Sequence, residues 1–215
     1  NLALLGPNCI GLVNLADRIP LTFEPVELKP VELKPVAGPG VCAVAQSGGM
    51  AGNLRMALAA KGVPVAFAVS TGNEAVLSAT DIGLALVDSP DVALFAFFVE
   101  QIVAPQQFLD LAERARAAGK PVVLLHSGKS TRAAQAAQSH TGALAGNWAI
   151  MKAFAAHAGV VVVETPDELF DTVSLLARYP HPPDKPLAVS TNSGAIRGFA
   201  LDLAEDIGLS YAGLS

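Results

Sequence analysis

Short apolar runs alternate with amphipathic segments along most of the chain. The apolar runs are rich in valine, phenylalanine and leucine, and each is followed by a stretch with the period of a helix. We therefore predict strands at residues 40–46, 64–72, 92–100, 120–128 and 160–164. We predict helices at residues 47–62, 78–90, 104–119, 147–159 and 165–180.

Several predicted helices begin at residues that favour a helix N-terminus. Ser78 or Thr80 can cap the second helix, and Thr165 can cap the last, with Pro166 at its first position. The strands are continuous hydrophobic runs, which is typical of a sheet covered by helices on both faces. Five strand–helix units in series predict an α/β fold with a doubly wound parallel sheet.

The N-terminal flank departs from this pattern. Residues 1–5, "NLALL", predict a short buried strand that leads into the loop "GPNCIG". Residues 20–40 contain many of the prolines and the direct duplication "PVELKPVELKPVAG". Proline lacks an N–H donor and fixes φ, so this segment predicts a linker or an extended edge segment, with a plain connector favoured.

The C-terminal flank repeats an order of predicted elements found earlier in the chain. After the break "HPPDKP", residues 186–208 resemble residues 41–62: a strand, a Ser-Gly turn and a helix. This repeat predicts the start of a second domain of the same topology. The chain begins without Met, in a buried-strand pattern, and ends just after a predicted helix. Both ends are expected to cut through folded units, so we expect it to be part of a longer protein.

Composition narrows the class of protein. The chain has a net charge of −5, which argues against nucleic acid or an anionic membrane as the main partner. Its two cysteines, Cys9 and Cys42, are too few for a disulfide scaffold and favour a reducing, cytoplasmic location. No apolar run approaches the length of a membrane span, and no signal peptide is recognisable.

Candidate chemistry lies where the predicted strands end, because ligands of doubly wound folds bind beyond the carboxyl ends of the strands. The polar groups there are Gln46–Gly49, Ser70–Glu74, Glu100, Ser127–Lys129 and, in the C-terminal repeat, Thr191–Gly194. Two of these are Ser-Gly turns that open helices, and such turns favour an anion. For either turn alone, an ordinary β–α turn with a serine cap is the favoured interpretation. Because the two turns match, an anion site becomes as favoured as an ordinary turn.

His140, in "SHTGALAG", is the candidate nucleophile. Glu100 ends an apolar strand and can accept a hydrogen bond from one imidazole N–H, which leaves the other nitrogen free. His157 and His181 are expected to be structural or exposed, and a role for His126 is open. No metal-ligand spacing, nucleophile elbow or Walker motif supports a metal site, a serine hydrolase or a P-loop.

Six motifs occur in a familiar order: "GPNCIG", "VAQSGG", "STGNEA", "FVE", "SHTGALAG" and "STNSGA". Together they resemble the NDP-forming acyl-CoA synthetases, relatives of the succinyl-CoA synthetase α subunit. The resemblance implies a flavodoxin-like ligase domain at residues 39–183. It also implies that residues 1–38 are the end of a CoA-binding Rossmann domain plus a linker, and that residues 184–215 begin a second flavodoxin-like domain.

The resemblance also implies roles for single residues. His140 matches the family's phosphorylated histidine, and Glu100 matches the carboxylate that holds it. The two phosphate-cradling helix N-termini correspond to Ser47, Gly48 and Gly49, and to Asn192, Ser193 and Gly194. Expected contacts to substrate or CoA are Asn8, Asn73, Ser139, Thr141 and Gly142.

Implied ligands are a carboxylic acid, CoA and ATP/ADP or GTP/GDP with Mg²⁺, the nucleotide and Mg²⁺ being bound by parts outside this chain. Implied partners are an ATP-grasp domain or subunit and further copies or subunits in an oligomer. Glu74 lies where relatives often have lysine, which leaves the acyl specificity open. One alternative is a non-catalytic module of a protein acetyltransferase that binds acyl-CoA or nucleotide. A weaker one is a flavodoxin-like domain for another anion.

Overall fold

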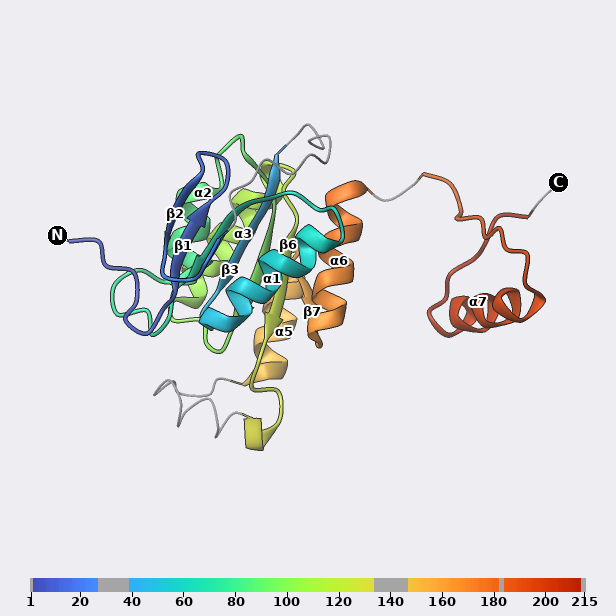
Figure 1. The fold of residues 1–215 in the computed structure, drawn as a ribbon. Helices are drawn as coiled ribbons and strands as arrows, with labels where there is room; N and C mark the ends of the chain where they lie inside the picture. Colours follow the sequence, from blue (N-terminus) through green and yellow to red (C-terminus); the bar gives the residue numbers. More distant parts are fainter. Residues whose placement is uncertain (1, 27–38, 134–146, 182–183, 214–215) are drawn as a thin grey trace. The chain divides into compact units, whose positions relative to one another are not determined.

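The computed structural model describes residues 2–26, 39–133, 147–181 and 184–213. The chain divides into two compact units, Asn1–Pro180 and His181–Ser215. A seven-stranded sheet, counted over the described residues, forms the centre of the first unit (Figure 1).

Five strands of this sheet run parallel, in the order β4-β3-β5-β6-β7. Numbered along the parallel part alone, this is the order 2-1-3-4-5 of flavodoxin-like folds, which confirms the predicted doubly wound sheet. The strands are β3 (Gly40–Ala45), β4 (Val65–Ser70), β5 (Val92–Val99), β6 (Val122–His126) and β7 (Val161–Val163).

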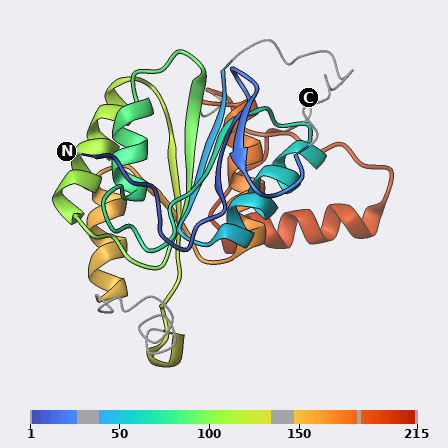
Figure 2. The ribbon, with the colours of Figure 1, turned by 60° about the vertical axis from the view of Figure 1, so that its left-hand side comes forward.

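Helices cover both faces of the sheet (Figure 2). One face is covered by α1 (Gly48–Ala60) and α6 (Pro166–Arg178), and the other by α2 (Ala79–Leu86), α3 (Pro105–Ala117) and α5 (Trp148–His157). All five predicted helices are present. Ser78 rather than Thr80 caps α2, in a capping box with Asp81, and Thr165 caps α6 as predicted.

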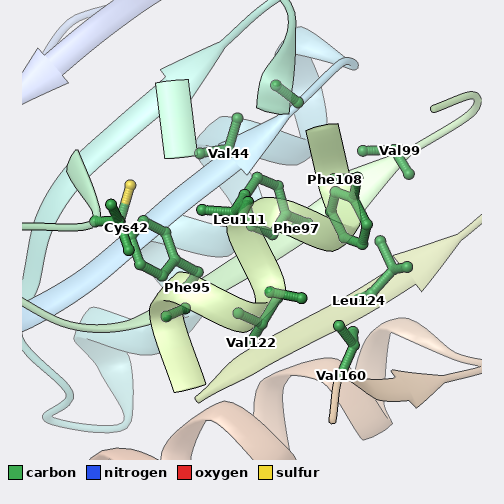
Figure 3. Packing of buried hydrophobic residues seen from close by; sticks show 14 of the residues in the cluster. Cys42, Val44, Phe95, Phe97, Val99, Phe108, Leu111, Val122, Leu124 and Val160 are labelled. Carbon is green, nitrogen blue, oxygen red and sulfur yellow. The ribbon is translucent and has the colours of Figure 1, made fainter. Parts of the chain in front are cut away.

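Successive side chains of the buried strands pack into two separate hydrophobic cores, one on each face of the sheet. Val41 and Ala43 of β3 belong to the core beneath α1 and α6, whereas Cys42 and Val44 belong to the core beneath α2, α3 and α5 (Figure 3). Because strand side chains alternate between faces, a strand covered on both faces must be apolar at every position. Burial also raises the pKa of the Cys42 thiol, which keeps this cysteine protonated and unreactive.

A hairpin that the sequence did not predict extends the sheet beyond β4. It consists of β1 (Gly11–Asn14) and β2 (Ile19–Thr22), and β1 pairs antiparallel with β4. The start of the proline-rich segment is thus an edge strand, where Pro20 is tolerated because one side of an edge strand needs no ladder hydrogen bond. Residues 27–38 of that segment lie outside the described residues.

The predicted buried strand at residues 1–5 is wrong. Leu2 and Leu4 are exposed, and Leu5 makes only an isolated parallel bridge to Leu77. The segment bonds to the irregular loop after β4, where the Leu77 N–H donates to the Leu4 carbonyl at 3.1 Å, and not to a regular strand. An apolar sequence alone therefore does not make it a strand.

The second unit contains helix α7 (Gly194–Asp206), which begins at the predicted turn. The Ser193 hydroxyl accepts a hydrogen bond from the Ile196 N–H and so caps this helix. The strand predicted before the turn is wrong: Leu187 makes only an isolated parallel bridge to Tyr211. A parallel strand needs further strands beside it, and the described residues of this unit supply none. The three-domain division at 1–38, 39–183 and 184–215 stays a prediction.

Candidate functional site

A cavity of about 500 Å³ lies at the carboxyl ends of β3, β4 and β5. Because β3 is the strand from which the connections run to both sides, this is the position at which doubly wound folds bind ligands. We call it the strand-end cavity. Six predicted site residues line it together: Asn8, Ser47, Gly48, Gly49, Asn73 and Glu100. The other lining residues are Cys9, Ile10, Phe23, Gln46 and Gly72.

The N-terminus of α1 forms one wall of this cavity. Ser47 is the N-cap, and its hydroxyl accepts a hydrogen bond from the Met50 N–H at 3.4 Å. The amide groups of Gly48 and Gly49 have no hydrogen-bond partner among the described residues. Free amides at the positive end of a helix favour an anion such as phosphate, as predicted for this turn.

Glycine occupies the two positions of this turn for different structural reasons. A Cβ on Gly48 would lie 2.6 Å from Cγ2 of Ile10, so this position must be glycine for the "GPNCIG" loop to approach the helix. A Cβ on Gly49 would meet nothing within 4 Å. Gly49 therefore leaves open space over the amides, where a ligand can reach the backbone.

Gln46 joins the end of β3 to the end of β5. Its Oε1 accepts hydrogen bonds from the backbone N–H groups of Glu100 at 2.6 Å and Gln101 at 3.1 Å. Its Nε2 donates to the Gln101 carbonyl at 2.9 Å. The Gln46 side chain is buried, so these three bonds are shielded from water and hold Glu100 at a fixed place beside the Ser-Gly turn.

The loop after β4 and the "GPNC" loop are held together by their backbones. The Asn73 N–H donates to the Pro7 carbonyl at 2.9 Å, and Asn8 Nδ2 donates to Asn73 Oδ1 at 3.2 Å. Gly72 has φ +61°, and a Cβ there would lie 2.1 Å from the Pro7 carbonyl oxygen. Only glycine allows this contact, which brings Asn8 and Asn73 to the same wall of the cavity.

Glu74 supports the same loop from behind. Its carboxylate accepts hydrogen bonds from the Thr71 hydroxyl and from the Ala79 N–H, both at 2.8 Å. Ala79 is the first residue of α2, so the carboxylate ties the loop to the start of that helix. Burial raises the pKa of Glu74 above its ordinary value, and the two hydrogen bonds oppose this shift only in part.

The remaining predicted residues fall into two groups. His140, Ser139, Thr141 and Gly142 lie outside the described residues. Asn192, Ser193 and Gly194 belong to the second unit. Of the lining residues that sequence reasoning missed, Ile10 and Phe23 had no local signal, whereas Cys9 adjoins Asn8. Gln46 was among the polar groups expected at the end of β3, but sequence reasoning assigned it no role.

Two further features of the described part of the chain bear on the class of site. It contains no group of three or more His, Cys, Asp or Glu side chains arranged to hold a metal ion. None of its helices is long and apolar enough to cross a membrane. Both cysteines are free, Cys42 inside the sheet and Cys9 beside the cavity.

The family model of the succinyl-CoA ligase like flavodoxin domain matches residues 38–176. The chain belongs to this family. The matched range covers the parallel part of the sheet and ends within α6, so the strand-end cavity is built largely on this domain, with the preceding residues adding one wall.

Relatives named as CoA ligases or synthases match nearly the whole chain. A trans-feruloyl-CoA synthase FCS1 from an unknown prokaryotic organism is 43% identical over 95% of this chain and 28% of its own length. Subunit alpha of the acetate–CoA ligase [ADP-forming] II of Pyrococcus furiosus is 30% identical over 98% of this chain and 44% of its own length. The chain thus spans less than half of these relatives.

A solved structure confirms the fold. The dinucleotide forming acetyl-coenzyme A synthetase 1 of Ca. Korarchaeum cryptofilum, in complex with phosphate and ADP, superimposes with a TM-score of 0.83 at 27% identity. The match covers 98% of this chain and 44% of that chain.

Proposed function

We propose that this chain is the phosphoryl-transfer part of an NDP-forming acid–CoA ligase. The carrying observation is the strand-end cavity, which places a free helix N-terminus, Glu100 and Asn73 on one ligand-sized surface. The relatives named as ADP-forming CoA ligases, and the structural neighbour in complex with phosphate and ADP, support this proposal.

The overall reaction is acyl-CoA + phosphate + NDP ⇌ acid + CoA + NTP. Phosphate first attacks the thioester carbonyl; the C–S bond breaks, a C–O bond forms, and CoA leaves as its thiol. A His140 nitrogen then attacks the phosphorus of the acyl phosphate, so that a P–N bond replaces the P–O bond and the acid leaves. The terminal oxygen of the NDP finally takes the phosphoryl group, which restores His140 and yields NTP.

Each residue of the site has a physical task in this scheme. Glu100 accepts the N–H of the His140 ring, which fixes the tautomer and keeps the opposite nitrogen available for phosphorus. The Gly48 and Gly49 amides bind phosphate oxygens, and a helix N-terminus contributes about 0.3–2 kcal/mol to such binding. Ser193 and Gly194 at the start of α7 do the same as a second helix N-terminus.

Further groups complete the reaction. Asn8, Asn73, Ser139, Thr141 and Gly142 contact the substrate or CoA, and Glu74 adjusts the acid specificity through its hold on the Asn73 loop. Nucleotide and Mg²⁺ bind an ATP-grasp domain or subunit, where Mg²⁺ neutralises charge on the phosphates. We infer a cytoplasmic, oligomeric enzyme in which this chain is one part.

The test is phosphoryl labelling of the full-length protein with NTP radiolabelled at the γ-phosphate, in the presence of Mg²⁺. We expect an acid-labile, base-stable label, as a P–N bond requires. His140→Ala should abolish the label. Glu100→Gln should slow labelling, because the amide holds the imidazole less strongly than a carboxylate does.

The matched control is His157→Ala, which removes an exposed histidine at the end of α5 and should label normally. A label that survives His140→Ala would exclude this histidine as the carrier. If no label forms although acyl-CoA binds, the non-catalytic module of an acetyltransferase replaces the ligase. Normal labelling of Glu100→Gln would remove Glu100 from the mechanism.

A further inference from the structure

A second cavity, of about 780 Å³, lies between α3 and α5. Its walls include Phe108, Trp148, Met151 and Phe154, and its polar residues include Glu100 and His126. We call it the α3–α5 cavity. Among the described residues of the phosphoryl-transfer scheme, Glu100 alone lines it. An apolar cavity of this volume with a few polar groups is typical of a small-molecule site.

The walls of this cavity suit an aromatic ring. Phe108 is fully buried and comes from α3, while Phe154 of α5 is 60% exposed and therefore has a face available to a ligand. Three aromatic side chains and a thioether allow edge-on and offset contacts to a flat ring, which gain more than the burial of area alone. A short aliphatic acid would leave most of this volume unfilled.

One polar residue of the wall, His126, does not oppose the entry of such a ring. Burial lowers the pKa of His126, so the imidazole is neutral at physiological pH and places no charge in the cavity. His126 Nδ1 contacts the Ser127 carbonyl oxygen; a carbonyl only accepts, so Nδ1 is the protonated nitrogen.

Two lysines hold the Trp148 ring at the wall of this cavity. The ammonium groups of Lys129 and Lys152 each lie 5.0 Å from the centre of the Trp148 ring, a distance at which a cation attracts an aromatic face. Both also pair with the carboxylate of Glu164.

Glu100 lies in the walls of both cavities. A ligand in the α3–α5 cavity therefore approaches the place where the phosphoryl group is proposed to be transferred. We propose that this cavity binds the hydrocarbon part of an aromatic carboxylic acid, the acyl substrate. This inference rests on the function proposed above, since it names the acid that the ligase activates.

Trp148 makes the test direct, because it is the only tryptophan in the sequence. We expect 3-phenylpropionate to change its fluorescence in a saturable way, with the dissociation constant checked by calorimetry. Propionate has the same carboxylate without the ring and should cause no saturable change. Phe154→Ala should weaken the binding of 3-phenylpropionate about five- to tenfold, as the loss of one aromatic contact predicts.

The matched control is Phe199→Ala, which removes a phenylalanine that is 71% exposed in the second unit and should bind 3-phenylpropionate normally. No saturable change, equal affinity for propionate, or unchanged affinity in Phe154→Ala would each overturn the proposal. Binding is measured without NTP or CoA, so its failure is separate from a failure of phosphoryl labelling. If the protein is labelled on His140 but does not bind 3-phenylpropionate, the proposed ligase function stands and the proposed acid site in this cavity is wrong.

Discussion

The side-chain oxygen of Gln46 accepts a hydrogen bond from the backbone N–H of Glu100 at 2.6 Å. The two residues are at the ends of neighbouring parallel strands, so this bond sets the distance between the turn proposed to bind phosphate and the candidate partner of the histidine. The backbone of Glu100 is thus fixed by a residue that touches neither the acid nor the nucleotide in the proposed scheme.

Removal of this amide should destabilise the protein. Gln46→Leu leaves two backbone N–H groups and one carbonyl of the half-buried Glu100 and Gln101 without this partner, so the free energy of unfolding should fall by about 2–4 kcal/mol. Urea denaturation measures this loss. Phosphoryl labelling should slow as well, because Glu100 is no longer held. The control Gln107→Leu, at an exposed position of α3, should change stability by no more than about 0.5 kcal/mol.

The two glycines at the start of α1 should respond differently to alanine. Gly48→Ala forces a methyl group against Ile10 and should cost about 1–3 kcal/mol of unfolding free energy. Gly49→Ala meets no neighbour, so folding should be unaffected or slightly favoured. Thermal unfolding of the two variants gives the comparison. Combining Gly48→Ala with Ile10→Ala should recover part of the loss; strictly additive losses would show that this contact is not the cause.

Gly72→Ala should separate the two loops that hold Asn8 and Asn73. The substituted residue would need positive φ and would drive its Cβ into the Pro7 carbonyl, so the loops must part at a cost of about 2–4 kcal/mol. Calorimetric unfolding measures the loss, and the site should lose its ligand affinity with it. Asn73→Ala, the control, removes only one exposed hydrogen bond and should cost about 0.5–1.5 kcal/mol. Equal losses in both variants would contradict the steric argument.

Glu74 should make stability fall as the pH rises. Its pKa is raised in the folded state, so the folded protein binds this proton more tightly than the unfolded chain does. The stabilisation is complete below the unfolded pKa and is lost as the pH rises through the folded pKa. Urea unfolding from pH 4 to pH 7 should therefore show a steeper decline for the natural protein than for Glu74→Gln. Parallel curves would mean that Glu74 titrates alike in both states.

Local sequence signals were sufficient for the repeated units. The strands covered on both faces are apolar at nearly every position, and several helices have marked ends, as with Ser78 and Thr165. The topological rule for strand ends then predicted that Ser47, Asn73 and Glu100 would meet, and they line one cavity. The segment at residues 1–5 failed because apolarity does not show whether a sheet edge is available to pair with.

The sequence by itself determined the class of fold, the number of strand–helix units and the polar groups at the strand ends, because these depend on periodicity and helix capping within a few residues. Only the tertiary structure decided the order of the strands, the addition of the β1–β2 hairpin to β4 and the hydrogen bonds from Gln46 to the end of β5. These pairings join residues distant in sequence. Their stability comes from contacts that exist only after the chain has folded, so no local pattern specifies them.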